Sequence, residues 1–284
     1  MAVASHSAVD VTAAATRGFV DLRTCTDVRA GAWPYEGPDV VTGWHHHPYH
    51  QVEYALRGVA EVETATGRYL LPPQQAVWIP AGLRHNTTLR GVRSVSVFFA
   101  PEMMPIDRAG VTTVDPDRAR VLAAAPVIRE MIAYGARWPI SRSGDADMTA
   151  DVFFDALARL VVEWLDDEVP LHLPTSTDPI LAAIMTHTNA NLATVTTKSA
   201  CRAVGTSERT LRRRFVSETG MTWQAYLIQA RLLRAMALLA GSDRTVLAIG
   251  VDVGFESPSG FTRAFRNLTG DTPSRYRRRV LADA

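Results

Sequence analysis

Two segments of similar design decide the fold of the C-terminal part of this chain: Lys198–Phe215, KSACRAVGTSERTLRRRF, and Val246–Phe265, VLAIGVDVGFESPSGFTRAF. Each reads as a short apolar helix, a turn that contains glycine, a serine that can cap the next helix, and then a basic helix. This is the pattern of a helix-turn-helix unit. Two such units in one chain can place two recognition helices in successive major grooves, so we expect double-stranded DNA as the partner.

The second helix of the first unit carries most of the basic residues. Leu211 and Phe215 are four residues apart and should face the core. Arginines on the opposite face can read guanine bidentately, with about 1–3 kcal/mol of discrimination for each good pair. The residues predicted to read bases here are Arg209, Arg212 and Arg213. Arg214 lies toward the edge, where we expect a contact with phosphate.

The second unit repeats this arrangement with fewer charges. Ile249 and Val251 of its first helix should pack inside, and Phe261 and Phe265 of its second helix should face the core. Gly260 has no side chain to reach a base, so we expect this helix to read sequence more weakly. The outward residues predicted to contact DNA are Ser259, Thr262 and Arg263.

A continuous helix is predicted between the two units, over Thr222–Ala240. Nineteen residues at 1.5 Å rise give a rod of roughly 28 Å, and one turn of DNA is about 34 Å. Such a rod fixes the distance between the two recognition helices, which can then reach two grooves on one side of the DNA.

Four stretches of this region resemble the AraC/XylS family of bacterial transcription regulators: Phe215–Gly220, Ala230–Leu239, Ile249–Phe265 and Thr272–Arg277. The resemblance covers about a hundred residues in register. It implies a seven-helix DNA-binding domain whose base-reading positions fall on the six residues named above. It also favours an activator, since members of this family more often activate than repress transcription.

The first hundred residues have a different pattern. Val52–Leu56, Ala60–Thr64 and Val95–Phe99 alternate apolar and polar residues, as half-buried strands do, and turn signals such as Arg57-Gly58 separate them. Several short strands at close spacing predict a sandwich or a barrel between residues 18 and 100.

Helical periodicity follows these strands. From Asp117 to Tyr134 and from Thr149 to Leu165, apolar residues recur at spacings of three and four, which predicts two amphipathic helices. Their apolar faces must be buried, either against their own barrel or in a homodimer interface, which the resemblance implies for such regulators.

The stretch Gly43–Glu53, GWHHHPYHQVE, carries four histidines, and His85 follows in Trp78–His85, WIPAGLRH. Alternate residues of a strand point to the same side, so His45 and His47 should face together, and His85 can complete a set of three imidazoles. Imidazole suits Ni, Zn, Co, Cu or Fe. His46 and His50, with Glu53, form a second possible set.

These two segments resemble the two motifs of the cupin family. His45, His47 and Gly58 fit the first motif, but Gln51 stands where that motif usually has glutamate. Pro80, Gly82 and His85 fit the second motif, and Leu89 replaces its usual asparagine. The resemblance implies a small β-barrel in which His45, His47, Gln51 and His85 converge as candidate metal ligands.

The sequence leaves three possibilities open for the barrel cavity. Three consecutive histidines with a fourth nearby favour a divalent transition metal, because barrel packing does not require them. Gln51 argues against a tightly held ion, since an amide leaves the charge of the cation uncompensated. The alternatives are a small organic effector in the barrel cavity or no ligand there at all.

The charge distribution agrees with two separate roles. Residues 178–284 hold 15 Lys and Arg against 8 Asp and Glu, whereas residues 1–177 hold 15 against 21. The net charges of +7 and −6 suit a polyanion for the C-terminal part only. Cys25 and Cys201 lie far apart and indicate free thiols of a reducing cytoplasm. No apolar run approaches the ~18 residues of a membrane span, and no secretory signal is expected.

The sequence therefore predicts a mixed fold in two domains. A cupin-like β-barrel with helices, for effector binding and dimerisation, is expected at residues 18–168, and an all-α tandem helix-turn-helix domain at 179–284. A disordered tail is expected at 1–17 and a proline-rich linker at 169–178. The predicted function is effector-controlled transcription regulation without enzymatic activity. A metal-dependent cupin enzyme with a DNA-binding module is the remote alternative, disfavoured by the missing glutamate.

Overall fold

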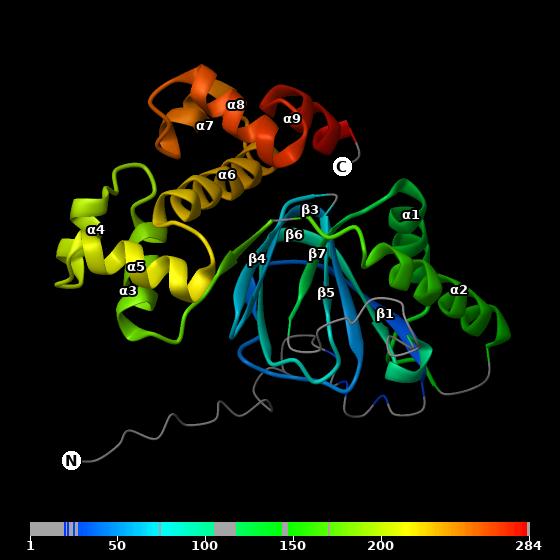
Figure 1. Cartoon of the computed structure of the whole chain (residues 1–284). Coiled ribbons are helices and arrows are strands. Elements are labelled where there is room, and N and C mark those ends of the chain that lie inside the picture. The colour runs from blue at the N-terminus through cyan, green and yellow to red at the C-terminus, as the bar shows by residue number, and fades with distance from the viewer. Residues whose placement is uncertain are drawn as a thin grey trace, which may run out of the picture.

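The computed structural model describes residues 20–282, with gaps at 21, 23–24, 26–27, 74, 105–117, 144–146 and 170. The tail predicted at 1–17 lies outside the described residues. A sheet-rich N-terminal domain is followed by a helical C-terminal domain (Figure 1). This confirms the predicted fold class. In the part of the chain that the structure describes, no helix is both long enough and apolar enough to cross a membrane.

The N-terminal domain is built on antiparallel strands. The strands are β1 Ala30–Glu36, β2 Val40–Val41, β3 His50–Thr64, β4 Gly67–Leu71, β5 Gln75–Ile79, β6 His85–Phe99, β7 Arg120–Ala123 and β8 His172–Pro174. The main hydrogen-bonded path runs β1-β6-β3-β4-β8, β2 pairs with β6, and β5 pairs with both β3 and β7. Among the described strands this path does not close on itself, so the cupin-like barrel is an open sheet.

The central strand β3 corrects one detail of the sequence prediction. Val52–Leu56 and Ala60–Thr64 belong to one strand, and the supposed turn at Arg57-Gly58 is an irregularity within it. Gly58 has φ 77°, which only glycine adopts freely, and a Cβ there would come within 2.3 Å of the Gly91 carbonyl oxygen. The glycine therefore bends a continuous strand where its backbone meets β6.

The helix expected from Asp117 begins later. Residue 117 lies outside the described residues, and Val121 and Leu122 belong to β7, which pairs with β5. The helix α1 covers Pro126–Gly135, with Pro126 at its first turn. Proline lacks the N–H that a helix interior requires, so it starts the helix instead of continuing one. The second predicted helix is α2, Met148–Trp164.

The helices α1 and α2 lie side by side on one side of the sheet (Figure 1). The α2 residues Phe154, Leu157 and Val161 are buried in the same cluster as Val52 and Trp78 of the sheet. Because these helices cover the outer face of β3 at that end, both faces of the strand are buried there.

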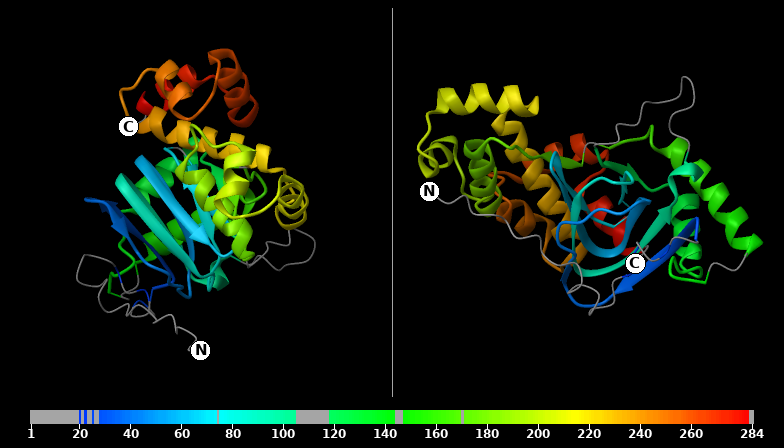
Figure 2. Two further views of the ribbon diagram at one scale, coloured as in Figure 1. Left: turned by 90° about the vertical axis from the view of Figure 1, so that its left-hand side faces the viewer. Right: turned by 90° about the horizontal axis from the view of Figure 1, so that it is seen from below.

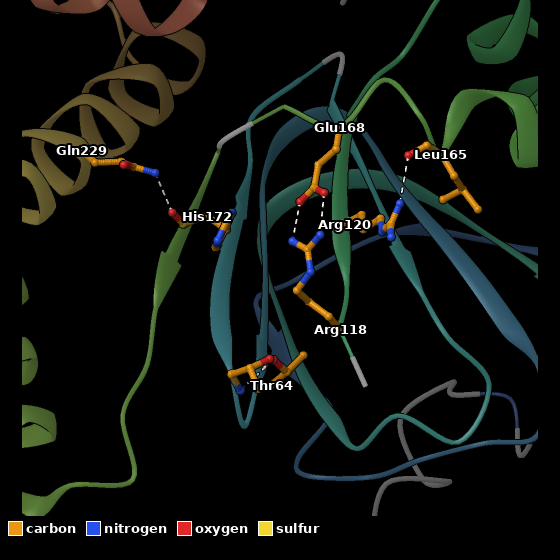
Figure 3. A network of polar contacts seen from close by, with 8 residues as sticks. Thr64, Arg118, Arg120, Leu165, Glu168, His172 and Gln229 are labelled. Atoms are coloured by element: carbon orange, nitrogen blue, oxygen red, sulfur yellow. Dashed lines mark hydrogen bonds and ion pairs between the residues drawn. The ribbon is translucent and has the colours of Figure 1, made fainter. Parts of the chain in front are cut away.

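The segment predicted as a linker at 169–178 contains strand β8, which pairs with the edge strand β4. Just before it, the Glu168 carboxylate accepts two hydrogen bonds of 2.6 Å from the Arg118 guanidinium (Figure 3). From the other domain, the Gln229 side chain donates a 2.7 Å hydrogen bond to the His172 carbonyl (Figure 3). Hydrogen bonds therefore attach the segment between the domains to the sheet on one side and to the helical domain on the other.

The C-terminal domain is entirely helical in its described residues. Its helices are α3 Pro179–Ala190, α4 Thr197–Ala203, α5 Glu208–Thr219, α6 Trp223–Gly241, α7 Val246–Asp252, α8 Pro258–Thr269 and α9 Pro273–Ala282. The 19-residue helix α6 separates α3 to α5, which include the first helix-turn-helix unit, from α7 to α9, which include the second (Figures 1 and 2). It also passes over the sheet and contacts β3.

One packing prediction in the second unit is wrong. Val251 was expected inside but is 61% exposed, whereas Ile249 and Val253 are buried. The inward face of the seven-residue helix α7 contains Ile249, and it continues to Val253, the residue that follows the helix four positions later. Val251 lies two residues from each of them, on the other side.

Candidate functional site

Helix α5 presents its basic residues to solvent. Ser207 caps the helix by accepting a 3.1 Å hydrogen bond from the Thr210 amide. Leu211 and Phe215 are buried, as their spacing predicted. The residues left exposed on this helix include Arg209, Arg212 and Arg213.

Helix α8 of the second unit has the same construction. Its cap is Ser257, which accepts a 3.2 Å hydrogen bond from the Gly260 amide. Phe261 and Phe265 are buried. Ser259 and Arg263 are exposed, and Thr262 is half-buried. The second unit thus offers one outward arginine at its predicted base-reading positions, against three in the first.

Two contacts on α5 were not anticipated from the sequence. Arg214 was expected at phosphate, but its guanidinium forms a 2.9 Å ion pair with Asp178, the residue that caps α3. Arg212 lies 3.4 Å from the Glu208 carboxylate one turn earlier. The Arg214 pair fastens α5 to α3, while the exposed Arg212 pair leaves that guanidinium accessible.

The structure brings three of the four predicted metal ligands into one histidine cluster, His45, His47 and His85. One ligand atom of each lies within 4.8 Å of those of the others. His45 and His85 form an isolated antiparallel bridge, which sets their ring centroids 4.3 Å apart. The His47 centroid lies 5.2 Å from that of His85. His45 and His47 lie before strand β3, so the loop and this bridge, not a common strand, bring the rings together.

Each imidazole donates one N–H to the protein around it. His45 Nδ1 donates to the Gly43 carbonyl at 2.8 Å, and His85 Nδ1 donates to the Leu83 carbonyl at 2.8 Å. His47 Nε2 donates to Gln51 Oε1 at 2.9 Å. The tautomers are thereby fixed, and the remaining nitrogen of each ring carries a lone pair. Two of these, His47 Nδ1 and His85 Nε2, are buried without a hydrogen-bond partner among the described residues.

Burial keeps the cluster neutral. It lowers the pKa of His47 to about 4 and that of His85 to about 3, and it also lowers the pKa of His45. Removal from water disfavours the imidazolium form, and neighbouring histidines add to this effect. Neutral imidazole is the form that binds metal ions.

Gln51, the fourth predicted ligand, is buried beside the cluster and has both ends of its amide engaged. Its oxygen accepts from His47, and its nitrogen donates to Glu53 Oε2 at 3.1 Å and to Ser96 Oγ at 3.3 Å. Ser96 in turn donates to the Glu53 carboxylate. A polar chain therefore runs from His47 to a fully enclosed carboxyl group.

The sequence did not assign this interior position to Glu53. Burial raises its pKa, against the hydrogen bonds from Ser96 and Gln51. The alternation of β3 was the available signal, because Gln51 and Glu53 are two residues apart and share a face. The second possible metal set does not assemble: His46 is exposed, and His50 Nδ1 accepts from the Ala81 amide at 3.0 Å.

A cavity of about 60 Å³ opens beside the cluster and is lined by His45, His47, Gln51 and Glu53 among others. Its volume is well below the roughly 300–1,000 Å³ of typical small-molecule pockets. Apolar side chains, including Trp33, Leu89 and Phe98, form the rest of its wall.

Segments of both domains match known protein families. Residues 200–279 match the family of helix-turn-helix domains, and residues 32–95 match the family described as AraC-like ligand binding domain.

Among curated relatives, the HTH-type transcriptional regulator NimR of Escherichia coli (strain K12) is 27% identical over 252 residues, which is 85% of this chain and 85% of NimR. The HTH-type transcriptional activator RhaR of the same strain is 33% identical over 135 residues, or 46% of this chain and 47% of RhaR. A solved transcriptional regulator with an AraC-type DNA-binding domain, from Chromobacterium violaceum, is 30% identical. The match covers 37% of this chain and 94% of that one, with a TM-score of 0.35.

Proposed function

The chain is an AraC-family transcriptional regulator with a ligand-binding domain and a helix-turn-helix DNA-binding domain, and we propose that its effector is a divalent transition-metal ion held by the histidine cluster. Ion binding would change how the two helix-turn-helix units sit on DNA. The observation that carries this proposal is the convergence of three neutral imidazoles with their N–H groups already directed outward.

The donor set fits such an ion. His45, His47 and His85 would hold it through His45 Nε2, His47 Nδ1 and His85 Nε2, the nitrogens that carry the free lone pairs. The outward hydrogen bonds from the other nitrogens are the usual support of metal-binding histidines. Imidazole ligands suit Ni, Zn, Co, Cu or Fe. A bound ion would give the two buried, unpartnered nitrogens the interaction that they otherwise lack.

We propose that Gln51 positions His47 and is not itself a ligand. Its oxygen accepts the His47 N–H and its nitrogen is committed to Glu53 and Ser96. The size of the cavity supports an ion over an organic effector at this position, because about 60 Å³ holds only a few atoms.

On the DNA side, we propose that Arg209, Arg212 and Arg213 read bases from α5, and that Ser259, Thr262 and Arg263 do so from α8. Five of the six are exposed, on capped helices whose aromatic residues are buried. Such a protein works in the cytoplasm, where bacterial DNA lies. The relative RhaR is an activator, which favours the same role here.

The proposed regulator is a homodimer joined through α1 and α2. These helices carry large apolar side chains on their outer surface: Val127 is 57% exposed, Tyr134 54%, Met148 81% and Val152 65%. A dimer would carry two copies of the tandem helix-turn-helix domain and would therefore bind a longer DNA site.

The test separates metal binding from DNA reading. DNA next to the protein's own gene is footprinted with metal-free and with Ni²⁺-loaded protein. Metal should change the protected site or its affinity, and His47→Ala/His85→Ala should lose that response while still binding DNA. Arg212→Ala should weaken binding to the protected site and leave metal binding unchanged. Absence of a protected site rules out the DNA assignment, and an unaltered metal response in the histidine variant rules out the cluster as its sensor.

A further inference from the structure

The hairpin Thr64–Gly67, between β3 and β4, contacts the histidine cluster through the sheet. Its first residue, Thr64, is buried and pairs with His85 across β3 and β6. The Thr64 hydroxyl accepts hydrogen bonds of 3.2 Å from the Thr66 amide and 3.1 Å from the Gly67 amide, which close the turn (Figure 3). A change in backbone position at His85 therefore moves the hairpin as a unit.

The residue that follows β8, Thr175, is attached to the same hairpin. Its hydroxyl donates a 2.6 Å hydrogen bond to the Ala65 carbonyl, and its amide donates one of 3.2 Å to the Thr66 carbonyl. The hairpin thereby holds the segment that leads into α3.

Asp178 connects this segment to the first recognition helix. Its amide donates a 3.1 Å hydrogen bond to Ser176 Oγ. One of its carboxylate oxygens caps α3 by accepting from the amides of Ile180 at 2.8 Å and Leu181 at 3.2 Å. The other oxygen forms the 2.9 Å ion pair with Arg214 of α5. One side chain therefore fixes both the start of α3 and the adjacent side of α5.

The second recognition helix has no ion pair of this kind. In the part of the chain that the structure describes, no ion pair joins α8 to another element. Phe261 and Phe265 hold α8 by burial, and Phe265 contacts Tyr276 of α9. The path of polar contacts from the hairpin therefore ends at α5.

We propose that Thr175, Asp178 and Arg214 are positioning residues that couple the histidine cluster to the first recognition helix. Arg214 does not contact DNA phosphate but sets the orientation of the base-reading arginines on its own helix. Coupling between distant sites can be carried by such chains of hydrogen bonds, ion pairs and rigid elements. The response to a bound ion rests on the proposed metal site, whereas the positioning of α5 does not.

Hydrogen–deuterium exchange on the metal-free full chain tests the positioning of α5 without DNA. Thr175→Val removes only the hydroxyl that binds the Ala65 carbonyl, so amide exchange in α5 should rise about three-fold or more, with no change in α8. Thr186→Val is the matched control, because this exposed α3 hydroxyl donates to the Ala182 carbonyl at 2.9 Å, outside the path. It should leave exchange in α5 unchanged. Unchanged α5 exchange in Thr175→Val, or an equal rise in α5 and α8, overturns the proposal.

Addition of Ni²⁺ tests the coupling. In the unchanged protein, Ni²⁺ should slow amide exchange both in the hairpin and in α5. Arg214→Gln should keep the Ni²⁺ affinity and the response of the hairpin but lose the response of α5, and Arg214→Lys, which keeps the charge, should restore it. Arg275→Gln is the control, because Arg275 is paired with Asp271 at 3.3 Å on the far side of α6 in sequence. It should keep both responses.

Two outcomes overturn the coupling: an α5 that still responds in Arg214→Gln, or a hairpin that does not respond although Ni²⁺ binds. If Ni²⁺ does not bind at all, the metal site fails, and the Thr175→Val comparison alone decides whether α5 is positioned from the hairpin. Thermal unfolding of each variant confirms that it is folded.

DNA binding separates the positioning role of Arg214 from a phosphate contact. Arg214→Gln should weaken binding to the footprinted site about ten-fold, the value of one good base contact. The slope of log affinity against log salt concentration should stay unchanged, whereas loss of a phosphate contact reduces that slope by about one. A reduction of that size would overturn the positioning role of Arg214.

Discussion

His45 and His85 hold each other in register through two backbone hydrogen bonds of 2.9 Å, one from each amide to the other's carbonyl. This pairing joins a loop before β3 to the first residue of β6, and it brings the two imidazoles to 4.3 Å between centroids, tilted by 55°, near His47. The histidine cluster thus depends on backbone geometry already built into the fold. It is pre-organised for a ligand, which lowers the cost of binding one.

Replacing Gln51 with leucine should weaken metal binding by about 10–100-fold, the usual effect of losing a residue that orients a metal-binding histidine. Without the amide oxygen, His47 Nε2 loses its acceptor and the ring loses its fixed orientation. Gln224→Leu, on an exposed part of α6, is the control. Titration with Ni²⁺ measures the metal affinity of both variants. Unchanged affinity in Gln51→Leu would show that the amide does not position the ring.

His85 should make the metal-free protein less stable in acid. Its pKa is near 6.5 in the unfolded chain and about 3 in the folded one, so between these values the unfolded state binds the extra proton. Stability from this residue is complete above pH 6.5 and is lost as the pH falls. From pH 7.5 to 5.5 the loss is about 1.4 kcal/mol for one histidine.

Urea unfolding with chelator present measures this effect as the difference between the unchanged protein and His85→Asn. Both proteins keep Glu53, whose raised pKa acts with the opposite sign, so its contribution largely cancels. Equal pH dependence in the two proteins would mean that His85 titrates normally in the folded state.

The two recognition helices should contribute unequally to DNA binding. Arg212→Ala and Arg213→Ala on α5 should each cost about 1–3 kcal/mol and relax the base preference at one position. Ser259→Ala on α8 should cost less than about 1 kcal/mol, the net value of one neutral hydrogen bond. Fluorescence anisotropy with the footprinted site measures the DNA affinity of each variant, and Arg137→Ala in the N-terminal domain is the control. A larger loss of DNA affinity from Ser259→Ala than from the arginine variants would contradict the proposal that α5 contributes more to DNA binding than α8.

Gly58→Ala should destabilise the protein far more than Gly220→Ala. Both glycines have φ above 70°, which costs an alanine about 1–2 kcal/mol. At Gly220 the added methyl group meets nothing within 4 Å, whereas at Gly58 it meets the Gly91 backbone at 2.3 Å. In urea unfolding, Gly58→Ala should therefore lose at least roughly twice as much unfolding free energy as Gly220→Ala. Equal losses would indicate that β3 and β6 can separate there without cost.

Much of the helical domain could be predicted from the sequence because its signals are local. The caps Ser207 and Ser257 and the buried pair Phe261 and Phe265 follow from spacing within one or two turns. The exposure of Val251 did not follow, because a seven-residue helix gives too few positions to fix its inward face.

The sheet domain was harder to predict because its decisive contacts join distant residues. Arg57-Gly58 carries the signal of a turn, and only the approach of Gly91 makes it a bend within one strand. Pro126 was a local signal for the end of β7 and the start of α1, and it would have corrected the helix boundary. The Gln51–Ser96–Glu53 chain needed the pairing of β3 with β6, which no spacing along the chain reveals.

The most direct test of the central claim is a calorimetric titration of chelator-treated protein with Ni²⁺, Co²⁺, Zn²⁺ and Cu²⁺, beside the variant His45→Ala/His47→Ala. At least one ion should bind at micromolar concentration or tighter, with one site per chain, and the variant should lose that site. No binding by the unchanged protein, or equal binding by both proteins, would contradict the assignment of the histidine cluster as the metal site.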